Sequence, residues 1–165
     1  MPTAFSIRQL TAQDEPFLWD MLYQAIYVPE GQPQPSRSIL QEPEIAHYVT
    51  GWGQRPGDMG WVAIEPSANQ PVGAAWLRLF LQQEKGYGYV DDNTPELSIA
   101  ILPEYRGQGV GTFLLDALLQ TACERFTAVS LSVSADNPAA RLYRRLGFMV
   151  VADSGSSLTM RKRLK

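Results

Sequence analysis

Residues 96–112, with the sequence ELSIAILPEYRGQGVGT, decide the fold of this chain. They open with an apolar run of strand length, residues 97–102, which Pro103 ends because proline has no backbone N–H to donate to a ladder. Three glycines then follow within five residues, and an apolar pattern with a helical period begins at Val110. The stretch therefore predicts a strand, a glycine-rich turn and a helix in direct succession.

The glycine-rich turn is typical of a binding site for a phosphate group. Backbone N–H groups in such a turn can crowd around an anion, and the N-terminus of the following helix adds a favourable dipole. A P-loop would need Gly-Lys-Ser/Thr where the helix starts, and this turn has no lysine. A dinucleotide-binding turn would need G-x-G-x-x-G, whereas these glycines run G-x-G-x-G and position 112 is threonine. An ordinary glycine-rich turn is the alternative at this point.

The turn resembles the cofactor loop of the GCN5-related N-acetyltransferases, the GNAT superfamily. Arg106, Gly109 and Gly111 match the family motif R/Q-x-x-G-x-G/A one for one. The resemblance implies that the loop wraps the pyrophosphate of acetyl-CoA. It also implies that the preceding strand binds the pantetheine arm through its backbone, with the N–H of Ile101 placed to polarise the thioester carbonyl.

A second stretch, residues 134–148, resembles the other GNAT signature, in which an Asn follows a strand and L-Y-x-x-x-G-F ends a helix. Leu142-Tyr143 and Gly147-Phe148 have that spacing, whereas Asn137 and Tyr143 are six residues apart where many members have seven. Together the two signatures imply one set of cofactor-binding residues. These are Ile99, Ala100, Ile101, Arg106, Gly107, Gln108, Gly109, Val110, Gly111, Thr112 and Asn137.

The activity that the resemblance implies is transfer of acetyl from acetyl-CoA to an amine, by direct attack within a ternary complex and without a metal. Tyr143 matches the family's general acid, and a phenol of ordinary pKa about 10 keeps its proton at neutral pH. Glu96 stands where several members place a glutamate base, and its ordinary pKa of about 4.3 would have to rise through burial. A tyrosine that only bonds to CoA and a solvated Glu96 are the alternatives.

Acceptor recognition is expected in three loops, residues 27–38, 51–57 and 82–95. Their aromatic and acidic side chains, with those of the neighbouring strand, are candidates for a slot that attracts a cation. The candidates are Tyr27, Trp76 and Tyr89, which we expect to contact the acceptor, and also Trp52, Tyr87, Glu84, Asp91 and Asp92. The amine itself is left open between a small molecule, an amino-acid derivative and a protein N-terminus or lysine.

Composition excludes several other classes of function. The net charge of −3 gives no basic field for nucleic acid, and no apolar run approaches the ~18 residues that a membrane span needs. Cys123 is the only cysteine and is expected to be a buried small hydrophobe, so an intrachain disulfide is impossible. His47 is the only histidine, which removes a multi-histidine metal site. We expect one cytoplasmic domain over residues 1–165, and a homodimer is possible because dimers are frequent in the family.

Periodicity predicts an α/β (α+β) fold in the order β–α–α–β–β–β–α–β–α–β–β, with a mixed sheet and helices on both faces. This order coincides with the GNAT topology, in which the central strand splays from its neighbour to admit the cofactor. The expected strands are 5–10, 61–64, 72–81, 97–102, 129–133, 148–151 and 158–161, and the expected helices are 15–26, 42–49, 110–126 and 137–146. A non-catalytic acyl-CoA-sensing module of the same fold is the alternative function, and an acyl group other than acetyl is left open.

Overall fold

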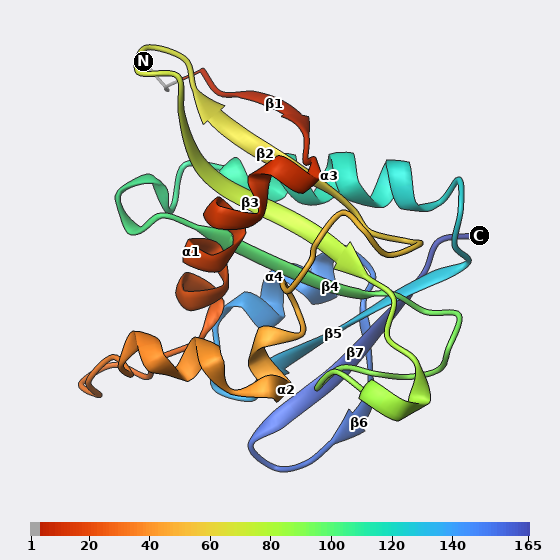
Figure 1. Ribbon diagram of the computed structural model, residues 1–165. Coiled ribbons are helices and arrows are strands. Elements are labelled where there is room, and N and C mark those ends of the chain that lie inside the picture. Colours follow the sequence, from red (N-terminus) through yellow and green to blue (C-terminus); the bar gives the residue numbers. More distant parts are fainter. Residues whose placement is uncertain (1–3) are drawn as a thin grey trace.

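A mixed sheet of seven strands is the framework of the computed structural model, which describes residues 4–165 (Figure 1). The strands are β1 (Ser6–Gln9), β2 (Met59–Glu65), β3 (Gln70–Arg78), β4 (Glu96–Ile101), β5 (Ala128–Ser134), β6 (Met149–Asp153) and β7 (Ser157–Arg163). The α-helices are α1 (Glu15–Ala25), α2 (Pro43–Ala46), α3 (Val110–Ala122) and α4 (Ala139–Arg145). The predicted order of strands and helices is confirmed.

Several element boundaries differ from the predicted ones by a few residues, and two of these differences have clear local reasons. The helix expected over residues 42–49 is shortened to α2, and the chain continues as hydrogen-bonded turns up to Trp52, whose N–H donates to the Val49 carbonyl. The helix expected from Asn137 starts at Ala139 instead, because the Asn137 side chain accepts the Ala139 N–H at 2.9 Å and so caps the helix from outside.

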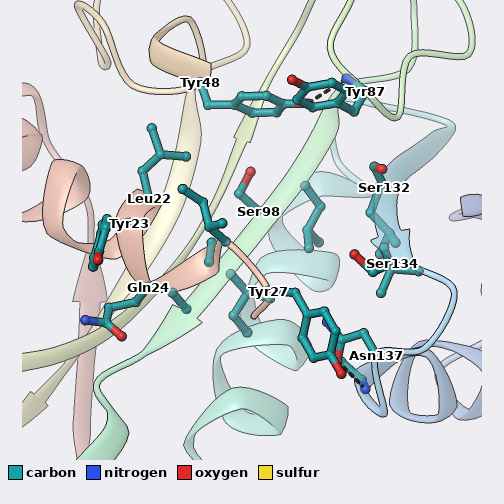
Figure 2. Close-up of a pocket in the computed structure, with 18 of the residues that line it drawn as sticks. Leu22, Tyr23, Gln24, Tyr27, Tyr48, Tyr87, Ser98, Ser132, Ser134 and Asn137 are labelled. Carbon is teal, nitrogen blue, oxygen red and sulfur yellow. Dashed lines mark hydrogen bonds between the residues drawn. The ribbon is translucent and has the colours of Figure 1, made fainter. Parts of the chain in front are cut away.

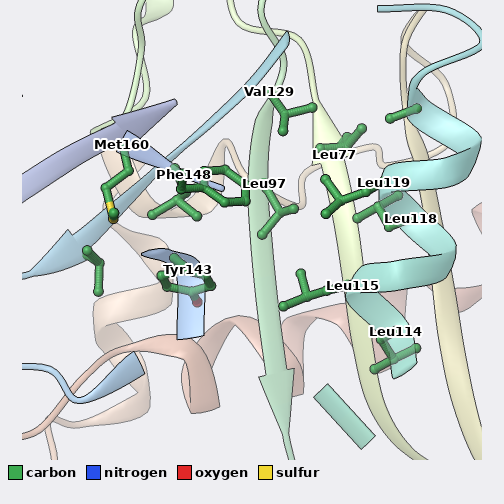
Figure 3. Close-up of a cluster of buried hydrophobic side chains, with 14 of the residues drawn as sticks. Leu77, Leu97, Leu114, Leu115, Leu118, Leu119, Val129, Tyr143, Phe148 and Met160 are labelled. Carbon is green, nitrogen blue, oxygen red and sulfur yellow. The ribbon is translucent and has the colours of Figure 1, made fainter. Parts of the chain in front are cut away.

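Strand order in the sheet is β1-β2-β3-β4-β5-β7-β6, so α3 connects two adjacent parallel strands. Side chains of β3 alternate between the two faces, as in any strand. Ala75 and Leu77 pack under α3, where Leu114, Leu115 and Leu118 are fully buried. Trp76 and its neighbour Ala74 pack on the other face against α1. The sheet therefore has one hydrophobic core on each face (Figures 1 and 3).

The centre of the sheet is split between β4 and β5. β4 pairs with β3 along its whole length, but it pairs with parallel β5 only at Glu96 and Ser130. Ser130 holds this closed end, since its N–H donates to the Pro95 carbonyl at 3.0 Å and its hydroxyl to the Gly88 carbonyl at 2.7 Å. Beyond this point the two strands diverge, as Figure 1 shows. The splayed sheet expected from the family resemblance is present.

A buried ion pair fixes the segment between α2 and β2. The Arg78 guanidinium contacts both carboxylate oxygens of Asp58, at 3.1 and 2.9 Å, and both side chains are almost completely buried. Arg78 also donates to the carbonyls of His47 and Thr50, at 3.0 and 2.6 Å. These bonds tie the turn that carries Tyr48 to the end of β3, next to the first residue of β4.

Cys123 does not have the predicted environment. We expected a buried side chain, but the residue is only partly buried and its thiol donates to the Gln120 carbonyl at 3.1 Å. Helix α3 ends at Ala122, which is fully buried, so Cys123 belongs to the turn that leaves the core. The helix expected over residues 110–126 therefore ends four residues earlier than predicted, and Cys123 falls outside it.

Candidate active site

A cavity of about 850 Å³ lies where β4 and β5 diverge (Figure 2). Its walls are all of β4, the second half of β5, the start of α4, and the end of α1 with the residues that follow it. Cavities that bind small molecules have volumes of roughly 300–1,000 Å³. The split in the sheet therefore makes a pocket of the size that binds small molecules.

Glu96 lies at the closed end of this cavity and is 3% exposed. Its carboxylate accepts hydrogen bonds from the Tyr48 hydroxyl at Oε2 and from the Gly88 N–H at Oε1, the latter at 3.0 Å. Burial raises the pKa of Glu96 to about 7, although both hydrogen bonds act in the opposite direction. A carboxyl group with this pKa can both accept and release a proton near neutral pH.

Tyr48 is the nearest partner of Glu96, and no motif or periodicity in the sequence pointed to it. Its hydroxyl donates to Glu96 and accepts the Tyr87 N–H at 2.7 Å, so it is held on both sides. Its ring packs edge-on against Phe80, with centroids 5.1 Å apart. Burial, followed by the charge of Glu96, raises the pKa of Tyr48 far above its ordinary value, so the phenol keeps its proton. The two partners are 48 residues apart, and no local pattern links them.

Tyr143, on α4, lines the cavity on the β5 side of the split. Its ring is buried and packs edge-on against Phe148, with centroids 5.9 Å apart. Burial raises the pKa of Tyr143 to about 12, so its hydroxyl is protonated throughout the neutral range. Among residues 4–165 no side chain or backbone group bonds this hydroxyl, which leaves it free for a molecule in the cavity.

The glycine-rich turn follows β4 and ends in α3. Gly107 and Gly109 have φ angles of 76° and 84°, in the left-handed region where a side chain would be strained. Gly109 immediately precedes α3, whose first N–H groups have no partner within the helix. Arg106 donates to the Ile101 carbonyl at 3.0 Å and to the Gln24 side chain at 3.2 Å. The turn thus presents several N–H groups at the cavity's open end, as an anion site requires.

The cavity is bridged opposite β4 by Tyr27. Its hydroxyl donates to the Asp136 carbonyl at 3.3 Å, so the segment after α1 reaches the loop between β5 and α4. Asn137 lies beside this contact in Figure 2 and also lines the cavity. Its side-chain oxygen accepts the Ala139 N–H, and no hydrogen bond within the described chain engages its side-chain amide N–H groups.

Residues 19–148 match the family model described as "Acetyltransferase (GNAT) family". The chain belongs to this family. A relative named mycothiol acetyltransferase, from Corynebacterium aurimucosum, is 35% identical over 89 residues, which make up 53% of this chain and 27% of that protein. The chain therefore spans about a quarter of the length of this curated relative.

Solved GNAT structures share the fold at low sequence identity. The ribosomal-protein-S18-alanine N-acetyltransferase of Escherichia coli aligns with a TM-score of 0.66 and 19% identity, over 98% of this chain and 95% of that one. The PaiA N-acetyltransferase of Thermoplasma acidophilum, solved in complex with coenzyme A, aligns with a TM-score of 0.65 and 18% identity, over 97% and 99%. At identities of 18–19% these alignments show that the folds are shared, and they show nothing further about this GNAT acetyltransferase.

Most of the residues that the sequence singled out in this GNAT acetyltransferase meet at the cavity. The predicted residues that line it are Glu96, Ile99, Ala100, Ile101, Arg106, Gly111, Asn137, Tyr143 and Tyr27. Gly107, Gln108, Gly109, Val110 and Thr112 stand on the turn and first helical residues at its open end. Strand β4 and the glycine turn with the start of α3 therefore carry all the predicted cofactor-binding residues except Asn137.

Two of the predicted acceptor contacts lie elsewhere. Trp76 is completely buried in the core on the α1 face, where its indole N–H donates to the Tyr48 carbonyl at 3.1 Å. Tyr89 lies outside the cavity, with its hydroxyl donating to Asp92 at 2.6 Å. Strand alternation turns Trp76 toward α1, and the tight bond to Asp92 turns Tyr89 away from the cavity.

The other loop candidates also have structural partners, except Tyr87. Trp52 is buried, and its indole N–H donates to the Leu77 carbonyl at 3.4 Å. Glu84 pairs with Arg55 at 2.7 Å, and Asp91 accepts the N–H of Asn93 at 2.9 Å. These acids therefore do not reach the cavity. The structure adds Tyr48, Tyr23 and Ser98 to the cavity wall.

The described part of the chain, residues 4–165, contains no group of three or more His, Cys, Asp or Glu side chains arranged to hold a metal ion. None of its helices is both long and apolar enough to cross a bilayer.

Proposed function

We propose that this GNAT acetyltransferase transfers the acetyl group of acetyl-CoA to a primary amine, which attacks the thioester directly within a ternary complex. The observation that carries the proposal is the split between β4 and β5, with Glu96 at its closed end, Tyr143 on its wall and the glycine turn at its open end. Acetyl-CoA would supply the acetyl group as a thioester. A cytoplasmic location and a homodimer stay predictions.

Glu96 and Tyr143 are the proposed proton carriers. Glu96, directly or through a water, takes a proton from the amine as the new C–N bond forms, and its pKa of about 7 suits that task. Tyr143 gives its proton to the sulfur that leaves when the C–S bond breaks, and burial keeps that proton in place beforehand. Glu96 is on β4 and Tyr143 is on α4, which follows β5, so the reacting atoms would lie between the two sides of the split.

The cofactor would lie along the edge of β4 that β5 leaves unpaired. Strand residues Ile99, Ala100 and Ile101 offer backbone groups to an extended arm, as a neighbouring strand would. The turn with Gly107 and Gly109 offers N–H groups to the pyrophosphate. An acyl group longer than acetyl would have to fit in the same cavity. Its end would lie beside Glu96.

Replacing Tyr143 by Phe tests the general-acid role. We expect Tyr143→Phe to lower kcat by about 100-fold, because a positioned acid contributes roughly 10²–10⁴ in rate. The Kd for acetyl-CoA should stay within about twofold, since only the hydroxyl is lost. Thiol release measured against a panel of amines gives kcat, and isothermal titration calorimetry gives Kd.

Tyr105→Phe is the matched control, because Tyr105 packs edge-on against Phe5 and is not part of the cavity wall. Its kinetics should equal those of the wild type. Full activity of Tyr143→Phe would remove Tyr143 from the chemistry. Binding of acetyl-CoA without thiol release for any amine would instead favour the sensing module over the enzyme.

A further inference from the structure

The part of the cavity left for the acceptor is mostly apolar and aromatic, and acetyl transfer as such does not require this. The proposed cofactor residues take β4, the glycine turn and α4, so the acceptor is left with the end of α1, residues 26–28, Gln34, Pro35, Ile45 and the rings of Tyr48 and Tyr87 (Figure 2). Most of these groups are apolar or aromatic. This acceptor wall sets what kind of amine fits.

Charge is almost absent from the cavity. Within the described chain, Glu96 and Arg106 are the only charged side chains that line it. Arg106 stands at the cofactor end, bonded to the Ile101 carbonyl. An acceptor carboxylate would therefore meet no cation near Glu96, and a second ammonium would meet no second acid. Both would be desolvated without a partner, which is unfavourable.

The hydroxyl groups of the acceptor wall are already used inside the protein. Tyr23 donates to the Pro35 carbonyl at 2.6 Å, Tyr27 to the Asp136 carbonyl at 3.3 Å, and Tyr48 to Glu96. These tyrosines present their rings to an acceptor, and their protons are engaged elsewhere. A peptide backbone bound here would leave its own N–H and C=O groups short of partners, which disfavours it.

Tyr48 and Tyr87 form a flat aromatic surface above Glu96. Their rings are 14° from parallel with centroids 6.4 Å apart, and in Figure 2 they lie side by side. Tyr87 is 60% exposed, so its ring meets whatever enters. The cavity therefore offers an aromatic surface to the acceptor.

We infer that the acceptor is a primary monoamine on an uncharged apolar body, ring-sized or a short alkyl chain, as in 2-phenylethylamine. This inference rests on the proposed acetyl transfer and specifies its substrate class. The ammonium loses its proton toward Glu96, and the body packs on Tyr48 and Tyr87. Ser98 adds one neutral hydroxyl on the same face of β4 as Glu96.

Three amines with one ring test the charge argument. With acetyl-CoA, 2-phenylethylamine, phenylalaninamide and phenylalanine are compared as kcat/KM, corrected for the ionisation of each amine. Phenylalanine should be about 100-fold or more below 2-phenylethylamine, because its carboxylate has no partner. Phenylalaninamide, which lacks that charge, should lie within about tenfold. Spermidine and a peptide with an N-terminal Phe should also be poorer than 2-phenylethylamine.

Truncation of Tyr87 tests the aromatic surface. Tyr87→Ala keeps the backbone N–H that bonds Tyr48, and it should lower kcat/KM for 2-phenylethylamine about tenfold but leave that for ethylamine unchanged. Tyr89→Ala is the matched control, two residues away and outside the cavity. It should leave both amines unchanged.

The outcomes separate the inference from the function beneath it. Phenylalanine, spermidine or the peptide equal to or better than 2-phenylethylamine would overturn the acceptor class and leave acetyl transfer standing. If none of the amines tested produced thiol release, acetyl transfer itself would be overturned. Calorimetry of 2-phenylethylamine against the protein saturated with CoA measures acceptor binding without turnover, and absence of binding there also overturns the inference.

Discussion

At the level of the single residue, two opposing effects set the pKa of Glu96. Its burial favours the neutral carboxyl group, while the hydrogen bonds from Tyr48 and the Gly88 N–H favour the carboxylate. Burial is the larger influence, which leaves the pKa near 7. Tyr48 is thus a positioning residue, because it acts on the reaction through Glu96.

Removing the Tyr48 hydroxyl should shift the pH dependence of the enzyme. Tyr48→Phe takes away a bond that lowers the pKa of Glu96, so that pKa should rise by about one unit from about 7. The rising limb of kcat/KM against pH should move up by the same amount, with activity lower at pH 7 and recovered at higher pH. A weakly basic fluorinated ethylamine should be used, so that the amine's own ionisation lies below the limb.

Tyr23→Phe is the control for this change. Tyr23 lines the same cavity, but its hydroxyl bonds the Pro35 carbonyl and does not reach Glu96. The limb should stay in place in this variant. An unchanged limb in Tyr48→Phe would mean that Tyr48 does not tune the base, or that Glu96 is not the base.

The turn between β4 and α3 shows why two glycines are needed at the level of the element. Gly107 and Gly109 have φ angles of 76° and 84°, and a Cβ at either position would meet no atom within 4 Å. Crowding is therefore not the reason for glycine at these positions. The left-handed backbone is, because it aims successive N–H groups at one point, and a side chain makes it costlier by about 1–2 kcal/mol.

A pair of glycine substitutions separates backbone strain from ligand binding. Gly109→Ala and Gly155→Ala should each lower the free energy of unfolding by about 1 kcal/mol, since Gly155 also has a left-handed φ, 92°, and open space around it. Only Gly109→Ala should weaken acetyl-CoA binding, by about tenfold, because only it disturbs the N–H groups before α3. Urea unfolding and calorimetry measure the two effects.

Equal acetyl-CoA affinity in both variants would show that the turn does not hold the cofactor. Equal weakening in both would point to a general loss of stability. Gly155 lies in the β6–β7 connection and does not itself line the cavity, although Ser157, two residues on, is part of the cavity wall. Gly155→Ala leaves the N–H groups before α3 undisturbed, so the comparison of the two variants tests the glycine turn.

The whole molecule consists of two sheet segments that meet at one point. Strands β1 to β4 form one segment and β5, β7 and β6 form the other, joined in the sheet at Glu96 and Ser130. Packing of α3 and α4 into a common core holds the segments together below the split. A cofactor between β4 and β5 would act as the missing strand.

Acetyl-CoA should therefore protect the split more than any other region. At about a hundredfold excess over Kd, bound ligand should raise stability by about 2.7 kcal/mol. Hydrogen exchange at short labelling times, when only local openings contribute, should slow in residues 97–101 and 131–134. The β2–β3 hairpin, none of whose residues lines the cavity, is the internal reference and should be unchanged.

Protection confined to the hairpin, or absent from both strands of the split, would contradict the proposed cofactor position. ATP at the same concentration is the ligand control, and it should produce neither the stabilisation nor the local protection.

Agreement between the sequence and the structure is greatest where the signal is local. Pro103 ended the strand, the glycines marked the turn, and the apolar period marked α3 within a few residues. The start of α4 was missed by two residues, because a side-chain cap at Asn137 replaced the first helical turn. Trp76 was misassigned, because strand alternation alone does not say which face of a sheet meets a cavity and which meets a helix.

The sequence by itself determined the order of elements, the turn and the family, because periodicity, proline, glycine and two short signatures act over a few neighbouring residues. Only the tertiary structure decided the chemistry of the cavity. Glu96 owes its raised pKa to burial, and that burial comes from Tyr48 and the loop with Gly88, which approach from other parts of the chain. The split itself depends on where β4 and β5 stop pairing, which is set by the packing of both strands against their own neighbours.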